Sequence, residues 1–383
     1  GAALTALAAC AIDPPPATIA APAPAALSGG ECPEFGCGAN SPAVDVYTFH
    51  ELSLVAASAG ALATIPNLQG LSLAAANGQA VLAQGSRRYA LKVSGGRISG
   101  LDCTRSPCAT LSGAALIGAT LGVYAGAPTG PEPPYRLVIA DVRSVPYFLG
   151  SGAVEGYTLQ WTADGAAPTN LCNNVALLTS LIAAQPGSGG DTPSAYEREE
   201  LMGLRVYEAI VFEGDRVDAK TKAMSVTADD RWFNIGCAGH TLAKLRMTRN
   251  TVHDQLTSAP VDATDAWRRR QATLRVLAAD YCGGGTPLTV AGQRLVWQGD
   301  LMTYFGPPAK PELEARWTER GASCLRVPRM VHPTSALGAA TFPDIRAAIA
   351  SACAAAGRAI PPDCTTDPSP WSMAGALRMS ANP

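Results

Sequence analysis

Three residues of this sequence have the side-chain types that a cysteine acyl-transfer enzyme uses. Cys282 would supply the thiolate nucleophile, His240 the general base and Asp280 the carboxylate that orients the imidazole ring. The competing interpretation is that Cys282 forms a disulfide, as a cysteine of an exported chain usually does. We favour the disulfide and expect no catalytic site, and we keep Cys282, His240 and Asp280 as the alternative.

A second enzymatic alternative is a hydrolase that cleaves peptide or glycan with two carboxylates. The acidic residues on predicted strands and loops that are available for this role are Glu208, Glu213, Asp215, Asp229, Asp230, Glu312 and Glu314. Their spacing selects no pair, and acidic side chains at strand edges and turns are usually solvated. The phosphate-binding patterns G-x-x-x-x-G-K-S/T and G-x-G-x-x-G and the serine pattern G-x-S-x-G do not occur in the sequence.

The charge balance argues against nucleic acid as a partner. Lys and Arg number 29 against 31 Asp and Glu, which leaves no global field to attract a polyanion. The basic run Arg268-Arg269-Arg270 lies on a predicted helix, where a solvated face is the expected role. The four histidines are scattered and no C-x-x-C pair occurs, so we predict no metal site, and nothing indicates a cofactor.

The first ten residues, Gly-Ala-Ala-Leu-Thr-Ala-Leu-Ala-Ala-Cys, resemble the end of a bacterial lipoprotein signal peptide. We expect residues 1–9 to be a signal-peptide remnant and Cys10 to carry the lipid that anchors the chain to a membrane. Ala11 favours sorting to the outer membrane. Residues 10–43 are rich in proline and alanine and predict an extended tether that holds an extracytoplasmic body away from the membrane.

The cysteine count supports an oxidising compartment such as the periplasm or the cell exterior. Of 11 cysteines, setting Cys10 aside leaves an even ten, and an even number is typical of disulfide-bonded exported proteins. The ten predicted disulfide cysteines are Cys32, Cys37, Cys103, Cys108, Cys172, Cys237, Cys282, Cys324, Cys353 and Cys364.

Spacing suggests which of these cysteines pair. Two short proline-containing loops predict the local pairs Cys32–Cys37 and Cys103–Cys108. Another pair, Cys353–Cys364, would staple the end of the last predicted helix. Three pairings remain open for the other four cysteines. Among these we prefer Cys172–Cys237 together with Cys282–Cys324, because each closes a moderate loop between predicted elements.

The hydrophobic pattern predicts an α+β fold of mainly antiparallel strands with two or three helices, stapled by disulfides. Residues 44–185 indicate a β-rich N-terminal domain, with strands that include 89–93, 135–142 and 156–161. Residues 186–193 are rich in Gly, Pro and Ser and mark a boundary.

Residues 194–364 indicate a second, α+β domain. The predicted strands are a 204–212 hairpin strand that returns through Val217, and strands at 288–290, 295–297 and 313–317. Helices are predicted at about 238–247, 263–279 and from Asp344 to Gly357. We expect residues 365–383 to be a loose tail.

Several segments of the sequence resemble one protein family. They are Pro168-Thr-Asn-Leu-Cys172, Cys237-Ala-Gly with Ala243-Lys244, Ala279-Asp-Tyr-Cys282-Gly, and Glu314-Ala-Arg-Trp317 through Gly321-Ala-Ser-Cys324. Together they resemble the ADYC-domain family of secreted or lipid-anchored bacterial proteins over about residues 110 to 328. The resemblance implies export and a disulfide framework, and it carries over no catalytic residue.

The sequence departs from this family at two positions. Leu245 and Thr273 stand where we would expect two further cysteines. If those cysteines pair in relatives, this chain has replaced the disulfide with packing. We therefore expect Leu245 and Thr273 to lie near each other.

These observations together predict a lipid-anchored, disulfide-stapled envelope protein that binds or scaffolds an envelope or extracellular ligand. An envelope hydrolase acting on peptide or glycan is the alternative. The two hypotheses differ in the state of Cys282, which is bridged in the first and free in a cysteine enzyme.

Overall fold

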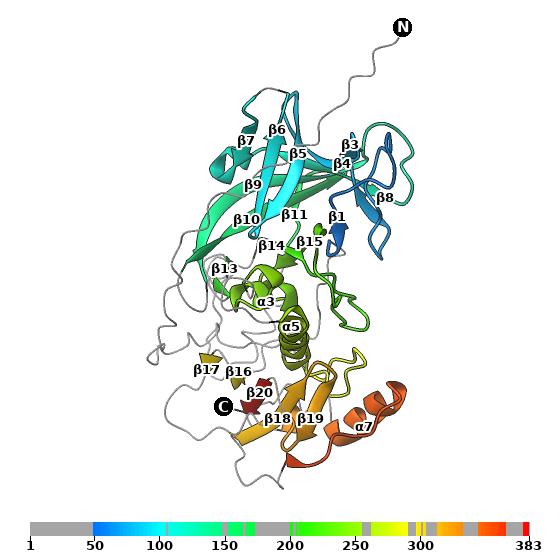
Figure 1. Ribbon diagram of the computed structural model, residues 1–383, viewed down its shortest axis with the longest axis vertical. Coiled ribbons are helices and arrows are strands. Elements are labelled where there is room, and N and C mark those ends of the chain that lie inside the picture. The colour runs from blue at the N-terminus through cyan, green and yellow to red at the C-terminus, as the bar shows by residue number, and fades with distance from the viewer. Residues whose placement is uncertain are drawn as a thin grey trace.

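Figure 1 shows the computed structural model, in which a large β-sheet, a pair of helices and a small sheet follow one another along the long axis. The residues that the structure describes are 49–104, 106–147, 152–163, 166–172, 200–201, 204–205, 207–254, 262–289, 296–299, 302–303, 312–331, 344–364 and 378–382. The predicted α+β class, with mainly antiparallel strands and two or three helices, is confirmed, since the described residues contain three α-helices.

The large sheet has 13 strands, and every pairing between them is antiparallel. Along its main path the order is β1 (Leu52–Ser53), β15 (Asp229–Cys237), β14 (Glu208–Gly214), β10 (Ala153–Ala163), β9 (Tyr135–Pro146), β8 (Thr120–Ala125), β4 (Gln79–Gln84), β5 (Arg87–Ser94), β6 (Arg97–Asp102) and β7 (Ala109–Ser112). The side strands are β2 (Leu71–Leu73), β3 (Ala75–Ala76) and β11 (Thr169–Asn170), and the 3-10 helix η1 (Gly113–Leu116) follows β7. This sheet joins strands from both predicted domains.

The large sheet coils so that its two halves face each other across one apolar core. The turn between β5 and β6 reaches β14, where the Glu213 carboxylate accepts hydrogen bonds from Gly95 N at 2.6 Å and Gly96 N at 3.1 Å. Tyr157 on β10 likewise accepts from Ile98 N on β6 at 2.8 Å. Alternating apolar residues of the strands point into this core, as a half-buried strand pattern predicts.

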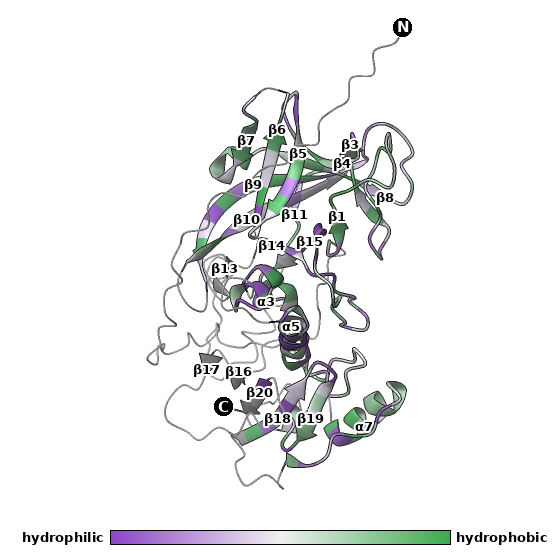
Figure 2. Cartoon of the chain, in the orientation of Figure 1, coloured by the Kyte–Doolittle hydropathy of each residue, from purple (hydrophilic) through white to green (hydrophobic). Residues whose placement is uncertain are grey.

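Helices α3 (Thr241–Met247) and α5 (Ala263–Ala278) lie between the two sheets. Gly236 on β15 permits the close approach of α3, because a Cβ atom at this position would lie 2.8 Å from Ala243 N. Figure 2 shows hydrophilic residues on α5 despite its position between the sheets. Ala279 ends α5 in the left-handed conformation, with φ of 49°.

The small sheet lies on the other side of α5 and has the strand order β17 (Met302–Thr303), β16 (Val296–Gly299), β20 (Arg378–Asn382), β18 (Glu312–Thr318) and β19 (Gly321–Leu325). The 3-10 helix η2 (Arg329–Val331) follows β19, and a separate two-stranded sheet pairs β12 (Glu200–Leu201) with β13 (Leu204–Arg205). Asp344 caps α7 (Ile345–Ala355) by accepting from Ala347 N at 2.9 Å, and Gly357 follows with φ of 66°.

Four disulfides lie in the described part of the chain, and two of them confirm predicted pairs. Cys103 bonds to Cys108, and Cys172 bonds to Cys237. The predicted pairs Cys282–Cys324 and Cys353–Cys364 are wrong. The structure pairs Cys282 with Cys353 and Cys324 with Cys364 instead.

The path of the chain after α7 explains the corrected pairing. This segment turns at Gly357 and then runs beside β19, where Leu325 N donates to Pro362 O at 2.9 Å. Cys324, on the same strand, therefore meets the cysteine that ends this segment. Cys353 lies on the buried face of α7 and meets Cys282.

Three predicted elements are also corrected. The strand that returns from β14 is β15, whereas Val217 forms only an isolated bridge with Met224. Leu288 and Thr289 are not in a strand, and Val290 lies outside the described residues. Part of the predicted loose tail is β20, which pairs with β16 on one side and β18 on the other.

Candidate functional site

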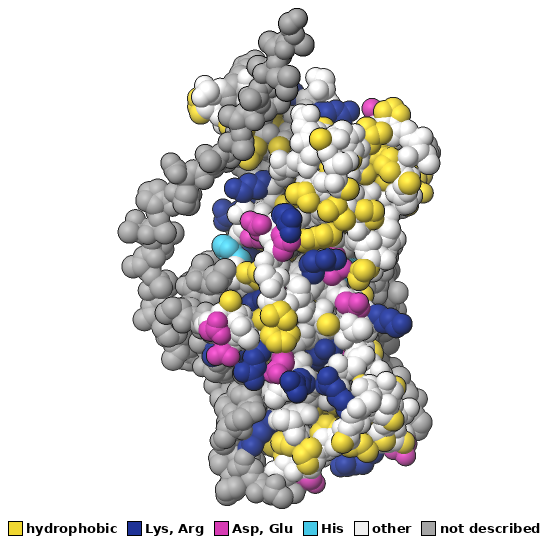
Figure 3. Space-filling model, turned by 45° about the vertical axis from the view of Figure 1, so that its right-hand side comes forward, with side chains coloured by type: hydrophobic (Ala, Val, Ile, Leu, Met, Phe, Trp, Pro, Cys, Tyr) yellow, Lys and Arg dark blue, Asp and Glu magenta, His cyan; other side chains and the backbone are white. Residues whose placement is uncertain are grey.

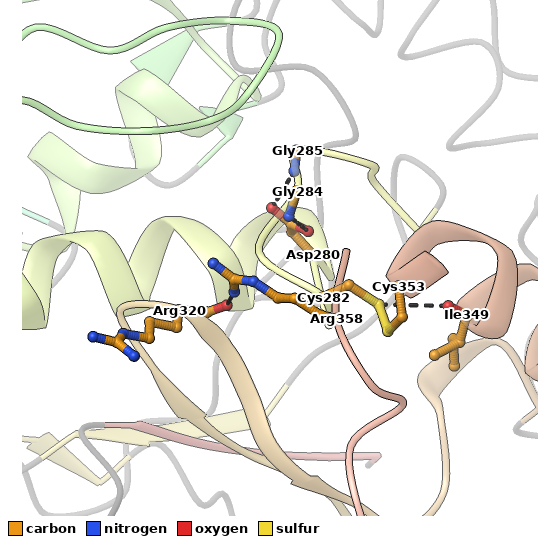
Figure 4. The surroundings of a disulfide bond; sticks show 8 residues. All are labelled: Asp280, Cys282, Gly284, Gly285, Arg320, Ile349, Cys353 and Arg358. Atoms are coloured by element: carbon orange, nitrogen blue, oxygen red, sulfur yellow. Dashed lines mark hydrogen bonds between the residues drawn. A yellow bond between two sulfur atoms is a disulfide. The ribbon is translucent and has the colours of Figure 1, made fainter. Parts of the chain in front are cut away.

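The family-like segment Ala279-Asp-Tyr-Cys282 lies where α5, α7 and the small sheet meet (Figure 4). Asp280 is fully buried and follows the end of α5. Its carboxylate accepts hydrogen bonds from the Arg275 guanidinium, from Gly284 N at 3.1 Å and from Gly285 N at 2.8 Å. Asp280 therefore fixes the glycine turn onto the last turn of α5.

Tyr281 packs into the core beside the small sheet. Its ring stacks on Trp317 with centroids 5.1 Å apart, and its hydroxyl donates a hydrogen bond to Glu314. Glu314 also accepts from Arg329 Nε at 2.6 Å, and Arg329 donates to Val276 O on α5 at 2.9 Å. Burial, and then the Glu314 charge, raise the pKa of Tyr281 well above its usual value, so the phenol stays a protonated donor.

Cys282 bonds to Cys353 of α7, and both residues are buried. Figure 4 shows this disulfide directed toward α7 and away from the Asp280 carboxylate. A Cβ atom on Gly283 would collide with Arg320 O, so the chain passes β18 and β19 too closely for any larger residue.

The alternative acyl-transfer triad is not assembled. Cys282 carries no thiol in the disulfide, and Asp280 directs its oxygens at Arg275 and the glycine amides instead of at His240. His240 is buried at the start of α3, where it is the N-cap residue. The three residues therefore have structural surroundings that differ from those of a nucleophile, base and orienting acid.

The loop at 217–224 connects the family-like segment to the large sheet. Lys222 Nζ donates to Gly285 O at 2.6 Å, and Arg275 donates to Thr221 O at 2.8 Å. Gln271 of α5 holds the same loop through Met224 N at 2.6 Å. The last turns of α5 and the glycine turn after Cys282 are thus hydrogen-bonded to the loop that follows β14 of the large sheet.

The seven candidate carboxylates do not form a catalytic pair among the described side chains. Three bond to separate arginines, as Glu208 does with Arg143, Asp215 with Arg270 and Glu314 with Arg329. Glu213 binds the Gly95 and Gly96 amides, Asp229 pairs with Arg231, and Asp230 is exposed. The side chain of Glu312 lies outside the description.

The predicted solvated face of α5 is wrong for Arg270. Its side chain is 4% exposed and its Nε lies 3.0 Å from Asp215. Burial outweighs the attraction of Arg270 and raises the pKa of Asp215 to about 6. Arg268 does remain partly exposed and pairs with Asp265 and Glu319.

Leu245 and Thr273 lie on α3 and α5, two helices that contact each other, and both residues are buried. Asn250 links them, since its backbone N donates to Leu245 O at 2.7 Å and its side chain accepts from Thr273 Oγ1 at 3.1 Å. Arg378 of β20 also donates to Thr273 Oγ1 at 2.9 Å. Hydrogen bonds as well as packing therefore join the helices here.

Glu51 is a buried acidic residue that the sequence did not predict. Its backbone is left-handed, with φ of 55°, a conformation that is strained for this residue type. One carboxylate oxygen lies 3.8 Å from Arg216 Nε, and the other has no hydrogen-bond partner among the described residues. Burial raises the pKa of Glu51, while Arg216 opposes this shift and itself lies 4.0 Å from the centre of the Trp232 ring. No local pattern marks such a residue, because its surroundings come from β14 and β15.

The burial of Lys244 was likewise not predicted from the sequence. This side chain is buried within α3, and its amine has no hydrogen-bond partner in the described part of the chain. Burial lowers the pKa of Lys244 to about 7. A lysine on an amphipathic helix is expected to be solvated. Lys244 is buried because α5 and the large sheet pack against α3, which the local sequence does not show.

Several predicted sites lie outside the described residues, namely the lipidation site Cys10 and the pair Cys32–Cys37. Among the residues that are described, no group of three or more His, Cys, Asp or Glu side chains is arranged to hold a metal ion.

Comparison with known proteins identifies one family. No curated protein and no solved structure matches the chain. The family model described as the ADYC domain matches residues 113–331, which is more than half of the 383 residues. This region runs from η1 to η2 and contains the Asp280, Tyr281 and Cys282 contacts. The chain belongs to the ADYC-domain family.

Proposed function

We propose that this chain is a bacterial envelope lipoprotein whose disulfide-stabilised extracytoplasmic body binds or scaffolds a ligand. The proposal rests on the side-chain contacts of the Ala279–Cys282 segment. The polar or sulfur groups of this segment all bond to other parts of the fold, as in Asp280, Tyr281 and Cys282. A family-typical segment of this kind supports a stable framework more than a reaction.

The disulfides support the extracytoplasmic part of the proposal. Eight described cysteines form four disulfides, and such bonds persist mainly in oxidising compartments. The lipobox-like step that ends at Cys10 supports a lipid anchor. None of the helices in the described ranges has the length and apolar character that crossing a membrane requires.

The surface supports binding through the N-terminal half of the large sheet. No charged residue occurs between Glu51 and Arg87 or between Arg105 and Glu132. These two stretches expose Leu62, Leu68 and Ile117, at 45%, 61% and 45%. Figure 3 shows hydrophobic side chains in the upper part of one face and a mixture of positive and negative side chains across its middle. Apolar side chains that gather on one part of a surface, as in the upper part of this view, are typical of binding sites.

Detergent partitioning of the chain expressed from its own gene tests the proposal. We expect the wild-type protein to enter the detergent phase of Triton X-114 and the Cys10→Ala variant to stay in the aqueous phase. Equal partitioning of both proteins into the aqueous phase would contradict the lipid anchor. Recovery of the wild-type protein in the cytoplasmic fraction would contradict export as well.

A further inference from the structure

The four described disulfides are of two kinds. Three of them join elements that are distant in sequence, with separations of 65, 71 and 40 residues, and each contains at least one buried cysteine. The fourth, Cys103–Cys108, spans a separation of 5 residues. Cys103 is exposed and Cys108 is half-buried, so a thiol in solution can reach this bond without any opening of the core.

The exposed disulfide lies at the free edge of the large sheet. It closes the connection from β6 to β7 directly beyond Asp102 and Ala109, the last residue pair of that hairpin. Strand β7 is the end of the sheet path and pairs with β6 alone among the described strands. Asp102 also holds the turn by accepting from Thr104 N at 3.0 Å and from Thr104 Oγ1 at 2.6 Å.

We propose that Cys103–Cys108 is a thiol–disulfide exchange site that accepts electrons from a dithiol reductant. Exchange requires a thiolate to reach one sulfur in line with the bond that breaks, so access separates this disulfide from the three other described disulfides. The inference is independent of the lipid on Cys10 and goes beyond the binding role proposed above.

The exchange has two steps. A thiolate of the reductant attacks Sγ of the exposed Cys103, the Cys103–Cys108 bond breaks, and Cys108 leaves as a thiolate that takes up a proton from water. The second thiolate of the reductant then attacks its own sulfur in the mixed disulfide and releases Cys103. The reductant is oxidised to a disulfide, and the cysteine pair is reduced to two thiols.

Reduction at this site frees the end of the β6–β7 hairpin while the rest of the fold stays bridged. The inward residues Ile98 and Leu111 still belong to the apolar core of the large sheet. The hydrogen bonds of Asp102 to Thr104 involve neither cysteine. Reduction at this site therefore breaks a disulfide at the sheet edge and leaves the three long-range described disulfides intact.

Timed reduction of the native full-length protein tests this assignment. The protein is incubated with dithiothreitol at neutral pH, quenched with N-ethylmaleimide at intervals, digested and mapped by mass spectrometry. We expect Cys103 and Cys108 to be labelled at least tenfold faster than the cysteines of the three other described disulfides. Labelling of Cys282, Cys172 or Cys324 at the same rate, or a Cys103–Cys108 pair that opens only in denaturant, would overturn the proposal.

Two sets of variants separate an exchange site from a structural staple. In the Cys103→Ser/Cys108→Ser double variant, we expect the three other described disulfides to be reduced at least tenfold more slowly than Cys103–Cys108 is in the wild-type protein. Reduction of these three disulfides as fast as that of wild-type Cys103–Cys108 would show that the bond protects the core. The single variant Cys108→Ser leaves Cys103 free and should react with 5,5′-dithiobis(2-nitrobenzoate) at least tenfold faster than Cys103→Ser. Equal rates would contradict attack at Cys103.

Discussion

The hydroxyl of Tyr281 donates a hydrogen bond to the carboxylate of Glu314, and both side chains are buried. Glu314 is at the same time the partner of the fully buried Arg329. One residue of the family-typical segment thus completes a charged network between α5, the small sheet and η2. This arrangement places the Tyr281 hydroxyl among the contacts that hold the fold together.

Loss of Arg329 should destabilise the fold strongly. The Arg329→Met substitution leaves Glu314 buried with the Tyr281 hydroxyl but without its cation, which typically costs about 3 to 5 kcal/mol of unfolding free energy. Urea denaturation with the disulfides intact measures this loss. The matched control is Arg88→Met, since Arg88 and Glu132 are 60% and 69% exposed and such pairs contribute about 1 kcal/mol or less. Equal stability of the two variants would contradict the role of the network.

A compensating second substitution tests the same network. Because an uncompensated charge causes most of the loss, Glu314→Gln/Arg329→Met should be more stable than Arg329→Met alone. The comparison uses the same urea titration of both variants. If the double variant were less stable than Arg329→Met, the loss in the single variant would not come from the uncompensated charge of Glu314.

The buried amine of Lys244 should make stability depend on pH. Its pKa in the folded chain is about 7, below the value of 10.5 in the unfolded chain, so the unfolded chain binds more protons between these two pH values. Stability therefore rises with pH across this window, and the destabilisation is complete below pH 7. The Lys244→Met variant should be more stable than wild type by on the order of 3 kcal/mol at pH 7, with the difference shrinking toward pH 10.

Urea titrations at pH 6, 8 and 10 check this prediction. Lys92→Met is the matched control, because Lys92 is exposed on β5 and its replacement should change stability little at any of these values. If the difference in unfolding free energy between Lys244→Met and wild type were the same at all three pH values, the prediction of a buried, unpaired amine would be contradicted.

Glu51 should produce the opposite pH dependence. Burial raises its pKa in the folded state, so the folded chain holds the proton more tightly and loses stability as pH rises through that raised pKa. Glu51→Gln lacks this loss and should be more stable than wild type at neutral pH by up to about 1 kcal/mol. The gain is modest because the pair with Arg216 is partly exposed, so solvent screens the charge of Glu51. Thermal unfolding at pH 4 and pH 7 should show the advantage of the variant at pH 7 alone.

The two kinds of disulfide should differ in what they contribute to stability. Replacing both cysteines of Cys282–Cys353 with serine opens a separation of 71 residues and should cost about 4 kcal/mol, whereas the same change at Cys103–Cys108 should cost about 2 kcal/mol. Chemical denaturation of the two double variants gives the comparison. A larger loss at Cys103–Cys108 would contradict the assignment of Cys282 to the framework.

Local patterns in the sequence predicted the regular elements well. The apolar spacing of Trp267, Leu274 and Leu277 predicted a helix at 263–279, and α5 spans Ala263–Ala278. The alternation of Tyr157, Leu159 and Trp161 likewise predicted β10, with Tyr157 and Leu159 in the core. These elements follow from side-chain periodicity, which is a local property.

Contacts between distant segments could not be predicted in the same way. Arg270 is buried because Asp215 arrives from the end of β14, and Cys353 meets Cys282 because the chain after α7 runs along β19. The strand β20 was missed because its five residues, Arg378–Asn382, lack apolar alternation and gain their place from β16 and β18. Burial of charge and choice of disulfide partner depend on topology, which short-range patterns do not contain.

Peptide mapping without reduction tests the central claim most directly. The protein is purified from its own host, alkylated before unfolding, digested and analysed by mass spectrometry. We predict an acylated Cys10 and a peptide that links Cys282 to Cys353, together with the Cys172–Cys237 and Cys324–Cys364 links. A free, readily alkylated Cys282 would contradict the structural role of the family-typical segment, and an unmodified Cys10 would contradict the lipid anchor.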